Sequence, residues 1–273
     1  MIHIRKLNGV IEPFDESKIR RSLINAGASH DMAHEILGKL RKSLYDGIST
    51  KEVFRFVFQE LRRYTPTLAE RFDLKNAILR MGPAGFAFEE YVAHILQSKG
   101  YTTQTDQYIR GTYITHEIDV VAEKSGEKIM VECKHHIQPW NGCHIQTALY
   151  VWARFLEVKK NFTQPMLVTN TVFSESIIRY ARGIGLRLMG WKYPKGDSLE
   201  ENIERYKLYP VTLLRRIEPD TLALLLEHKI VLLKTLAQLS QPELAQILQL
   251  PLSKVKVISE EAQELCGINE IPI

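Results

Sequence analysis

The spacing of the apolar residues changes twice along the chain, and this change constrains the fold more than any other feature. Residues 1–82 begin with two short apolar runs around an Asn-Gly pair, which predict a β-hairpin, and continue at helical spacing. Residues 83–194 alternate strand-like runs with amphipathic stretches, a pattern typical of an α/β domain. Residues 195–209 are polar and predict a linker, and residues 210–273 are leucine-rich with helical periods. We therefore expect a multi-domain α+β and α/β architecture that ends in a helical domain.

Length and composition agree with several folded domains. The chain has 273 residues, against a typical domain size of about 150. Its hydrophobic content of 45% and charged content of 25% exclude a disordered or disulfide-stapled chain. No apolar run is long enough to span a bilayer, and the first residues lack a signal-peptide pattern, so no membrane partner is expected. Three cysteines, an odd number, favour a reducing compartment and predict a cytoplasmic protein.

The positive charge is concentrated at the start of the chain. The formal net charge is +4, yet residues 1–82 alone carry 15 Lys and Arg against 10 Asp and Glu. A basic first domain is compatible with binding of phosphates or nucleic acid. A helical domain with solvated basic side chains explains the charge equally well.

Two carboxylates and a lysine stand out in the middle segment. Asp119 lies near the end of one strand-like run, and Glu132 and Lys134 lie in the next, after a short turn. Side-chain alternation places Glu132 and Lys134 on the same face of their strand. Two carboxylates suit Mg²⁺, which activates water near a phosphodiester, and a lysine can orient that water or neutralise charge on phosphorus. The spacing alone is equally compatible with polar residues on the wet face of an exposed hairpin.

The surrounding stretches occur in the order of a known enzyme family. They read GFAFEEYV at 85–92, EIDVV at 117–121, VECK at 131–134 and VTN at 168–170. Together they resemble the Mrr-like branch of the PD-(D/E)xK nuclease superfamily over roughly residues 84–192. The resemblance implies the α-β-β-β-α-β core of a restriction-endonuclease-like fold.

This resemblance assigns roles to individual residues. Asp119 and Glu132 match the metal ligands, Lys134 matches the catalytic lysine, and Glu89 matches the acidic residue on the preceding helix. Gln146 begins a Gln-x-x-x-Tyr pattern that resembles a motif on the next helix of some members. The implied activity is DNA phosphodiester hydrolysis with Mg²⁺ or Mn²⁺. Such nucleases generally act as dimers, so a homodimer is expected.

The approach to Asp119 departs from that family. Related sequences usually have a glycine-rich approach, whereas this chain has His116 and Glu117 there. These two residues either shape the site or are ordinary polar strand residues, and we favour the second interpretation.

The histidines near the catalytic pattern also invite a zinc interpretation. His135 and His136 follow Lys134, and Cys133 and Cys143 are close in sequence. The chain has no C-x-x-C pair, and strand alternation directs Cys133 away from Lys134 into the core, so structural zinc is not expected.

The first segment resembles the ATP-cone, the regulatory nucleotide-binding domain of ribonucleotide reductases and of the repressor of their genes. The stretches that carry the resemblance are RKLNG at 5–9, Glu12, FD at 14–15, KI at 18–19 and YDGIST at 45–50. The resemblance implies ATP or dATP as a regulatory ligand over about residues 2–82. The chain contains no G-x-x-x-x-G-K-[ST] pattern, so ATP hydrolysis is not expected.

The ATP-cone resemblance also names a nucleotide site. Lys6 and Lys18 would neutralise the phosphates, and Thr50 would lie near the base or ribose. Arg5 and Glu12 complete the candidate set. The family often has a second basic residue where this chain has Leu7, and Arg5 would point to the other face of its strand. Both ligand binding and a retained fold without ligand are therefore compatible with this segment.

The last segment looks like a helix-hairpin-helix module over about residues 224–252. The hairpin position, usually Gly-x-Gly, reads Leu250-Pro251-Leu252. Those glycines let backbone amides approach DNA phosphates closely, so their absence weakens direct DNA binding without excluding it. We therefore interpret the segment as a helical element for packing, dimerisation or protein contacts.

The sequence thus favours a metal-dependent DNA endonuclease that is regulated by ATP or dATP at the N-terminal domain. The expected domains are 1–82 for nucleotide, 83–194 for the nuclease, 195–209 as linker and 210–273 as the helical domain. The alternative is a non-catalytic, nucleotide-sensing regulator that grips DNA with a nuclease-like fold. Cleavage of DNA that depends on a divalent metal separates the two hypotheses.

Overall fold

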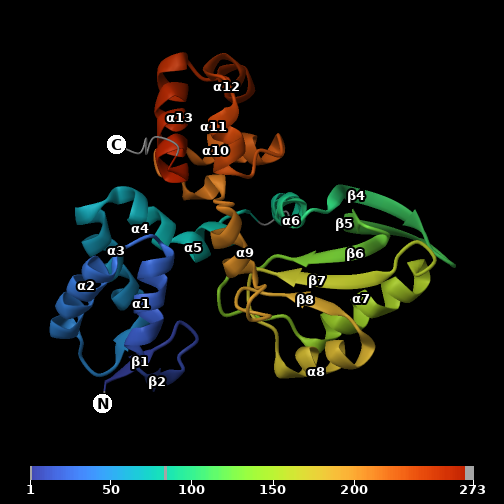
Figure 1. The fold of residues 1–273 in the computed structure, drawn as a ribbon, viewed down its shortest axis with the longest axis horizontal. Coiled ribbons are helices and arrows are strands. Elements are labelled where there is room, and N and C mark those ends of the chain that lie inside the picture. The colour runs from blue at the N-terminus through green and yellow to red at the C-terminus, as the bar shows by residue number, and fades with distance from the viewer. Residues whose placement is uncertain (1, 83–84, 268–273) are drawn as a thin grey trace. The chain divides into compact units, whose positions relative to one another are not determined.

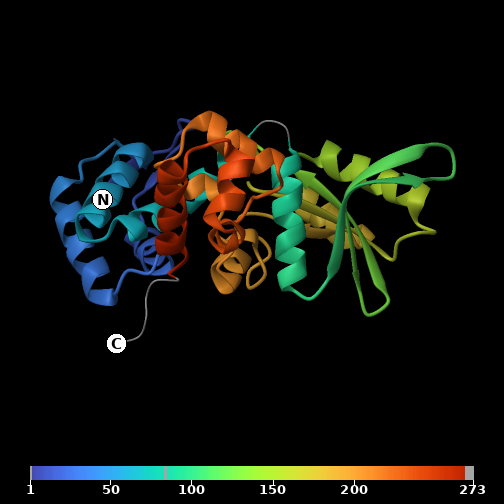
Figure 2. The ribbon, with the colours of Figure 1, turned by 90° about the horizontal axis from the view of Figure 1, so that it is seen from above.

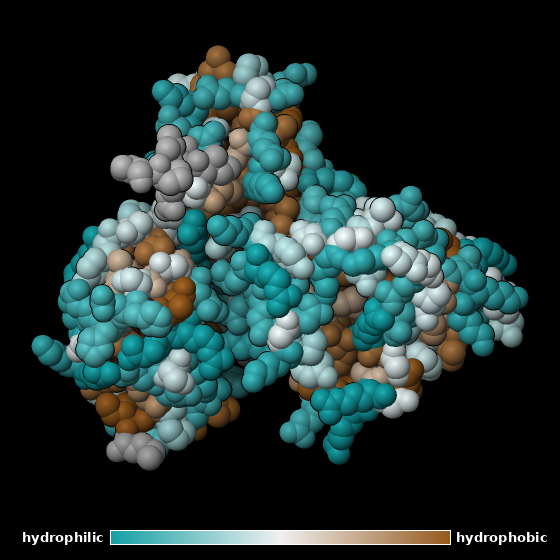
Figure 3. All heavy atoms as spheres, viewed as in Figure 1, coloured by the Kyte–Doolittle hydropathy of each residue, from teal (hydrophilic) through white to brown (hydrophobic). Residues whose placement is uncertain are grey.

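The computed structural model describes residues 2–82 and 85–267, and the chain divides into two compact units between Lys75 and Asn76. The domain boundary expected at residue 83 and the last residues of the expected helical domain, 268–273, lie outside the described residues. No helix in the described part is long and apolar enough to cross a membrane. The face visible in Figure 3 is mainly hydrophilic, with apolar side chains in scattered groups.

The first unit combines a small sheet with helices, as the sequence predicts for its start. The sheet has the strand order β2-β1-β3, and β1 and β2 form the antiparallel hairpin predicted around Asn8-Gly9, where Gly9 has a φ of +83°. Gly9 lacks a Cβ, so it adopts this left-handed conformation without strain. The elements are β1 (His3–Arg5), β2 (Ile11–Pro13), α1 (Glu16–Asn25), α2 (His30–Ser43), β3 (Ile48–Ser49), α3 (Thr50–Tyr64) and α4 (Pro66–Phe72).

Local hydrogen bonds explain where these helices begin. The Asp15 side chain accepts the backbone N–H of Ser17 at the start of α1. Ser49 and Glu52 form a reciprocal capping box at the start of α3, as their spacing predicts. Aliphatic side chains from α1, α2 and α3, among them Leu23, Ile36 and Leu61, form the buried core of the unit.

The second unit is built on a five-stranded sheet with the sequential order β4-β5-β6-β7-β8. The strands β4, β5 and β6 are antiparallel neighbours, and β6, β7 and β8 are parallel. The sheet confirms the predicted restriction-endonuclease-like order of elements. These are α6 (Phe86–Ser98), β4 (Thr102–Arg110), β5 (Thr115–Lys124), β6 (Glu127–Lys134), α7 (Ile145–Val158), β7 (Gln164–Thr169), α8 (Glu175–Ile184) and β8 (Arg187–Met189).

Helices cover both faces of this sheet. Figure 1 shows α7 and α8 on one side, and the view from above in Figure 2 shows α6 in front of the other side. The buried cluster under α7 and α8 includes Ile118, Met130, Val151, Leu167 and Ile177. This packing holds the strands rigidly and leaves the ends of β5 and β6 as the place for functional side chains.

The segment predicted as a linker is partly helical. Helix α9 (Leu199–Tyr206) lies within it, and Leu199 and Ile203 are buried. Ser198 and Glu201 form a capping box at the start of α9. The high polar content of the segment obscured a short helix with one buried face.

Helices form the rest of the second unit, as predicted. They are α5 (Leu74–Leu79), which crosses the boundary between the units, η1 (Val211–Leu213), α10 (Pro219–Glu227), α11 (Leu233–Gln238), α12 (Gln241–Leu248) and α13 (Leu252–Cys266). Gln249 ends α12 in the left-handed conformation, so the connection to α13 is very short. The Tyr91 hydroxyl on α6 donates to the Leu208 carbonyl, which ties the helical segment to the sheet domain.

Candidate active site

The strands β5 and β6 place Asp119 and Glu132 next to one another. Their ladder of paired residues runs from Lys124 and Glu127 to Val120 and Val131 and ends there. Asp119 and Glu132 occupy the next position on each strand, where the Asp119 Oδ2 atom accepts the backbone N–H of Cys133 at 2.7 Å. A side chain thus replaces the next ladder hydrogen bond, and this fixes the Asp119 carboxylate against β6.

Glu132 is held by a residue that the sequence analysis did not identify. Arg154 on α7 donates through Nη1 to Glu132 Oε2, and their side chains are only 12% and 16% exposed. Nη1 also donates to the Glu117 carbonyl at 3.1 Å, and Nη2 donates to the Tyr150 hydroxyl at 2.6 Å. The signal was present, because Arg154 extends the Gln-x-x-x-Tyr pattern by a further four residues, one helical turn.

Burial favours the protonated forms of the Asp119 and Glu132 carboxyl groups. Burial and the charge of Asp119 raise the pKa of Glu132 to about 7, although Arg154 and Lys134 oppose the shift. Burial also raises the pKa of Asp119, against the hydrogen bond from Cys133. Two acidic groups that repel one another in a partly dry site gain stability from a nearby cation.

Glu89 joins this acidic group from the first turn of α6. Burial, together with the charges of Asp119 and Asp106, raises the pKa of Glu89 to about 8. Gly85 precedes α6 with a φ of +76°, and a Cβ there would lie 3.2 Å from Glu89 Oε1. Glycine therefore leaves the space that the Glu89 carboxyl occupies.

Asp106 is another residue of the acidic group, and the sequence analysis missed it. It lies opposite Asp119 in the β4–β5 register, between the pairs Thr105–Val120 and Gln107–Ile118, and has a φ of +54°. It shares a hydrogen bond with Glu89. Nothing in the polar sequence of β4 distinguishes this residue from its neighbours.

A lysine from the C-terminal helices reaches the same region. Lys229, which follows α10, pairs with Glu90 and also contacts Thr105 Oγ1 at 3.1 Å and Asp106 Oδ2 at 3.5 Å. Thr105 in turn donates to Glu90. The ion pairs of Lys229 therefore involve Glu90, the residue that directly follows Glu89.

The other predicted catalytic residues, Lys134 and Gln146, are exposed to solvent. Lys134 is the last residue of β6 and is exposed, and its positive charge lowers the pKa of Glu132. Its ammonium group has no ion-pair partner in the part of the chain that the structure describes. Gln146 is also exposed, in the first turn of α7, on the helix face that carries Tyr150 and Arg154. The structure thus groups Glu89, Asp119 and Glu132, with Lys134 and Gln146 available to solvent.

The donor set fits a small divalent cation held by few protein ligands. Residues 2–82 and 85–267 contain no cluster of three or more His, Cys, Asp or Glu side chains able to hold a metal ion. Asp119 and Glu132 offer two hard carboxylates, and Mg²⁺ is commonly bound by one or two carboxylates with water and phosphate oxygens. Burial raises the pKa of both residues, and the charge of Asp119 adds to the raised pKa of Glu132, so a bound cation would stabilise their ionised forms.

The histidines make structural contacts. His116 Nε2 lies 3.6 Å from Glu157 Oε2, and Glu157 also accepts the backbone N–H of Tyr113. A ring nitrogen of His135 lies 2.9 Å from the Ile78 carbonyl oxygen, and the His136 backbone N–H donates to Asn170. These contacts support the β4–β5 hairpin and the chain after β6. Glu117 differs from them, because its charge contributes to the raised pKa values of the acidic group.

The predicted nucleotide residues of the first unit form two groups of contacts. Glu12 lies between two lysines, with Oε2 2.7 Å from Lys6 Nζ and Oε1 3.5 Å from Lys18 Nζ. The ion pair with Lys6 lowers the pKa of Glu12. The Thr50 hydroxyl donates to the Arg5 carbonyl at 3.0 Å and joins α3 to β1. Two basic side chains thus converge on one anionic group.

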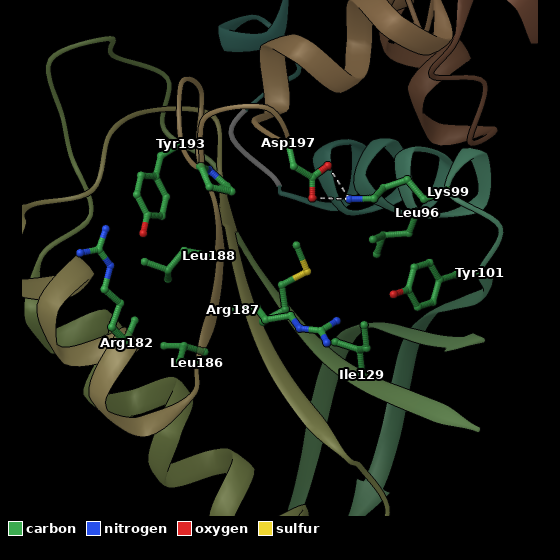
Figure 4. Close-up of a pocket in the computed structure, with 13 residues that line it drawn as sticks. Leu96, Lys99, Tyr101, Ile129, Arg182, Leu186, Arg187, Leu188, Tyr193 and Asp197 are labelled. Carbon is green, nitrogen blue, oxygen red and sulfur yellow. Dashed lines mark hydrogen bonds and ion pairs between the residues drawn. The ribbon is translucent and has the colours of Figure 1, made fainter. Parts of the chain in front are cut away.

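A cavity of about 350 Å³ lies elsewhere in the second unit (Figure 4). Its lining includes Tyr101, Arg182, Arg187 and Tyr193, and it contains none of the predicted catalytic residues. The Lys99–Asp197 ion pair lies at its border. The acidic group instead lies where the β5–β6 ladder ends, on two strands inside the sheet, and none of its residues lines this cavity.

Comparisons with known proteins match three successive parts of the chain. Residues 2–76 match the family model of the ATP cone domain, residues 80–192 match a restriction endonuclease model, and residues 209–266 match the AF1548-like, C-terminal model. An uncharacterized protein of Archaeoglobus fulgidus is 38% identical over 178 residues, which cover 64% of this chain and all of that relative. The crystal structure of a protein of unknown function, AF1548, matches with 37% identity and a TM-score of 0.60 over 67% of this chain and all of that one. These matches confirm the resemblances to the ATP-cone and to the Mrr-like nucleases.

Proposed function

Because this chain belongs to the AF1548-like family and joins a restriction endonuclease domain to an ATP cone domain, we propose that it is a divalent-metal-dependent DNA endonuclease regulated by ATP or dATP. The observation that carries the proposal is the pairing of Asp119 and Glu132 where the β5–β6 ladder ends. In a restriction-endonuclease-like fold, this pairing presents two partly buried carboxylates side by side on neighbouring strands. A restriction endonuclease fold without such a pair would support DNA binding alone.

Asp119 and Glu132 are the residues that would hold Mg²⁺ or Mn²⁺. The bound ion would polarise the phosphodiester and lower the pKa of a bound water. The hydrogen bond from Cys133 keeps the Asp119 carboxylate in one orientation, so the ligand is arranged before the metal arrives. Preorganised ligands reduce the reorganisation needed in the reaction.

Lys134 and Glu89 would act beside these ligands. The Lys134 ammonium group is exposed, so it can contact a phosphate oxygen or the attacking water. Glu89, with a pKa of about 8, retains a proton at neutral pH and can donate a hydrogen bond. Gln146, exposed on the α7 face that also carries Tyr150, would contact the DNA backbone. We propose a homodimer, because a double-strand break requires two such centres.

The ATP cone domain would supply the regulation. Lys6 and Lys18 both pair with Glu12, and the phosphates of ATP or dATP would compete with that carboxylate for the two lysines. Arg5 and Thr50, joined by their hydrogen bond, lie at the neighbouring strand and helix start. A nucleotide regulates the nuclease only if it binds two conformations or assembly states with different affinities.

Plasmid cleavage tests the proposal. Supercoiled and linear DNA are incubated with Mg²⁺ or Mn²⁺, with and without ATP and dATP, using wild type, Asp119→Asn and Asp220→Asn. Asp220 lies exposed in the first turn of α10, so Asp220→Asn makes the same chemical change away from the site. We expect cleavage by wild type and Asp220→Asn and a loss of at least about 100-fold in Asp119→Asn, the size typical for losing a main catalytic group.

Two results would contradict the nuclease. Equal cleavage by wild type and Asp119→Asn would identify a contaminant. Metal-independent DNA binding without cleavage on any substrate would favour the non-catalytic regulator. A cleavage rate that does not change with ATP or dATP would contradict the proposed regulation but not the proposed nuclease activity.

A further inference from the structure

Arg154 contacts a proposed metal ligand and has no role in the nuclease scheme above. Its guanidinium pairs with Glu132 in a partly dry site, where both side chains are mostly buried. A buried cation beside a metal-binding carboxylate affects the metal directly, because two cations on one carboxylate repel one another.

Besides Glu132, two residues hold the guanidinium in place. The Tyr150 hydroxyl and the Glu117 carbonyl accept from Nη2 and Nη1, and the Arg154 Cζ atom lies 4.7 Å from the centre of the Tyr150 ring. Tyr150 lies one turn earlier on α7, so both residues share the helix face toward β6. The Arg154 side chain therefore keeps two anchors when Glu132 is removed from it.

The guanidinium also has unused hydrogen-bonding capacity. The Arg154 Nε atom is buried and has no hydrogen-bond partner among the described residues. An arginine bound bidentately by a phosphate uses two of its N–H groups in parallel. Arg154 binds Glu132 through Nη1 alone, so this pair is not bidentate.

We propose that Arg154 is a positioning residue that neutralises Glu132 before the metal binds and moves to a phosphate oxygen of the DNA afterwards. The inference rests on the proposed function, since it takes Glu132 as a metal ligand and DNA as the substrate. In the absence of DNA, Arg154 opposes the metal. DNA gives the guanidinium another partner, so metal and DNA strengthen each other's binding by the same factor.

Metal binding without DNA is the first measurement. Mn²⁺ is titrated into the full-length protein at one alkaline pH, the same for all variants, so that the carboxylates are charged, and free Mn²⁺ is followed by electron paramagnetic resonance. We expect Arg154→Gln to bind Mn²⁺ about 5- to 10-fold more tightly than wild type, because the competing charge is gone. The matched control is Arg187→Gln, which breaks an arginine–carboxylate pair with Glu127 elsewhere on the sheet and leaves Mn²⁺ affinity unchanged.

The second measurement is the coupling to DNA. The affinity for a fluorescent duplex is measured by anisotropy in EDTA and in Ca²⁺, which also binds carboxylate oxygens. We expect Ca²⁺ to tighten DNA binding by wild type and by Arg187→Gln several times more than by Arg154→Gln. Arg154→Lys keeps the charge without the planar fork, so its Mn²⁺ affinity stays near wild type while its coupling falls.

The outcomes separate this inference from the nuclease proposal. Unchanged or weaker Mn²⁺ binding by Arg154→Gln overturns the inference, and so does tighter Mn²⁺ binding by Arg154→Lys. If Asp119→Asn binds Mn²⁺ as tightly as wild type, the metal site itself is wrong, whatever Arg154 does. Arg154→Lys is measured in every series, so a failure of Arg154→Gln to fold leaves the charge test in place.

Discussion

The Asp119 Oδ2 atom lies 2.7 Å from the Cys133 backbone nitrogen, so a side chain of β5 takes the place of a backbone acceptor for β6. This bond has two consequences for the candidate site. It orients the carboxylate, and it satisfies an N–H group exactly where the two strands stop pairing. The same carboxylate therefore serves both the candidate site and the stability of the strand pair.

Substitutions at Asp119 should separate these two roles. Asp119→Asn keeps an oxygen acceptor for Cys133, whereas Asp119→Ala leaves that N–H unpaired in a partly buried position. An unsatisfied donor costs about 1–3 kcal/mol. We expect both variants to lose cleavage and only Asp119→Ala to unfold at lower urea concentration. Equal unfolding midpoints for the two variants would show that the hydrogen bond contributes little to stability.

The stability of the protein should fall as pH rises through neutrality because of Glu89. Its pKa is raised from 4.5 in the unfolded chain to about 8 in the folded one, so the folded state binds more protons between these values. Its contribution is thus fully present below about pH 4.5 and is lost toward pH 8, on the order of 1–3 kcal/mol after allowance for partial exposure. Urea unfolding at pH 5.5, 7 and 8.5 measures it.

The matched variants for this pH series are Glu89→Gln and Glu175→Gln. Glu175 lies exposed in the first turn of α8. We expect Glu89→Gln to reduce the pH dependence to the part that Glu132 and Asp119 contribute, and Glu175→Gln to retain the wild-type slope. A wild-type stability that rises from pH 5.5 to 8.5 would contradict the assignment.

Nucleotide binding should depend on Lys6. Replacing it with methionine removes one of the two cations that meet at Glu12 while keeping the length of the side chain. We expect Lys6→Met to weaken ATP and dATP binding about 10-fold, equivalent to about 1.4 kcal/mol. Isothermal titration calorimetry measures the change, and Lys42→Met, an exposed lysine in the last turn of α2, serves as the control. Equal affinity in both variants would place the nucleotide elsewhere or exclude it.

Gly85 should resist substitution more than another glycine of the same domain. Gly85→Ala forces a side chain into a φ of +76° and brings a Cβ within 3.2 Å of Glu89 Oε1. We expect a loss of about 1 kcal/mol in unfolding free energy and a reduced cleavage rate. Gly183→Ala in α8, where nothing lies within 4 Å, should instead gain about 0.5–1 kcal/mol from helix propensity. The two variants differ in sign, so thermal melts distinguish them.

The acidic pair was predictable because spacing and chemistry coincide in Asp119, Glu132 and Lys134. A hairpin connection places the two carboxylates on adjacent strands, and the family resemblance supplies the order of the elements around them. Arg154 carried a weaker signal, since four-residue spacing after Tyr150 indicates a shared helix face but does not name the partner on the sheet. Asp106 had no signal, because its left-handed backbone within a regular register appears only in the folded chain.

The helix α9 shows how composition can mislead. Its segment reads as polar, yet a Ser-x-x-Glu pattern at Ser198 and Glu201 indicates a helix start. Two buried aliphatic residues, Leu199 and Ile203, pack this helix against the protein. Burial depends on what surrounds a short helix, and that information comes from other parts of the chain.

Lys229 makes the C-terminal helices part of the electrostatics of the nuclease sheet. It pairs with Glu90, the residue next to Glu89, and reaches Asp106, which shares a hydrogen bond with Glu89. A shortened chain that ends after α9 would keep the α-β-β-β-α-β core and lose this lysine. Its acidic edge would then carry one uncompensated negative charge more than the full-length protein. The proposed catalytic unit is therefore longer than the restriction endonuclease fold alone.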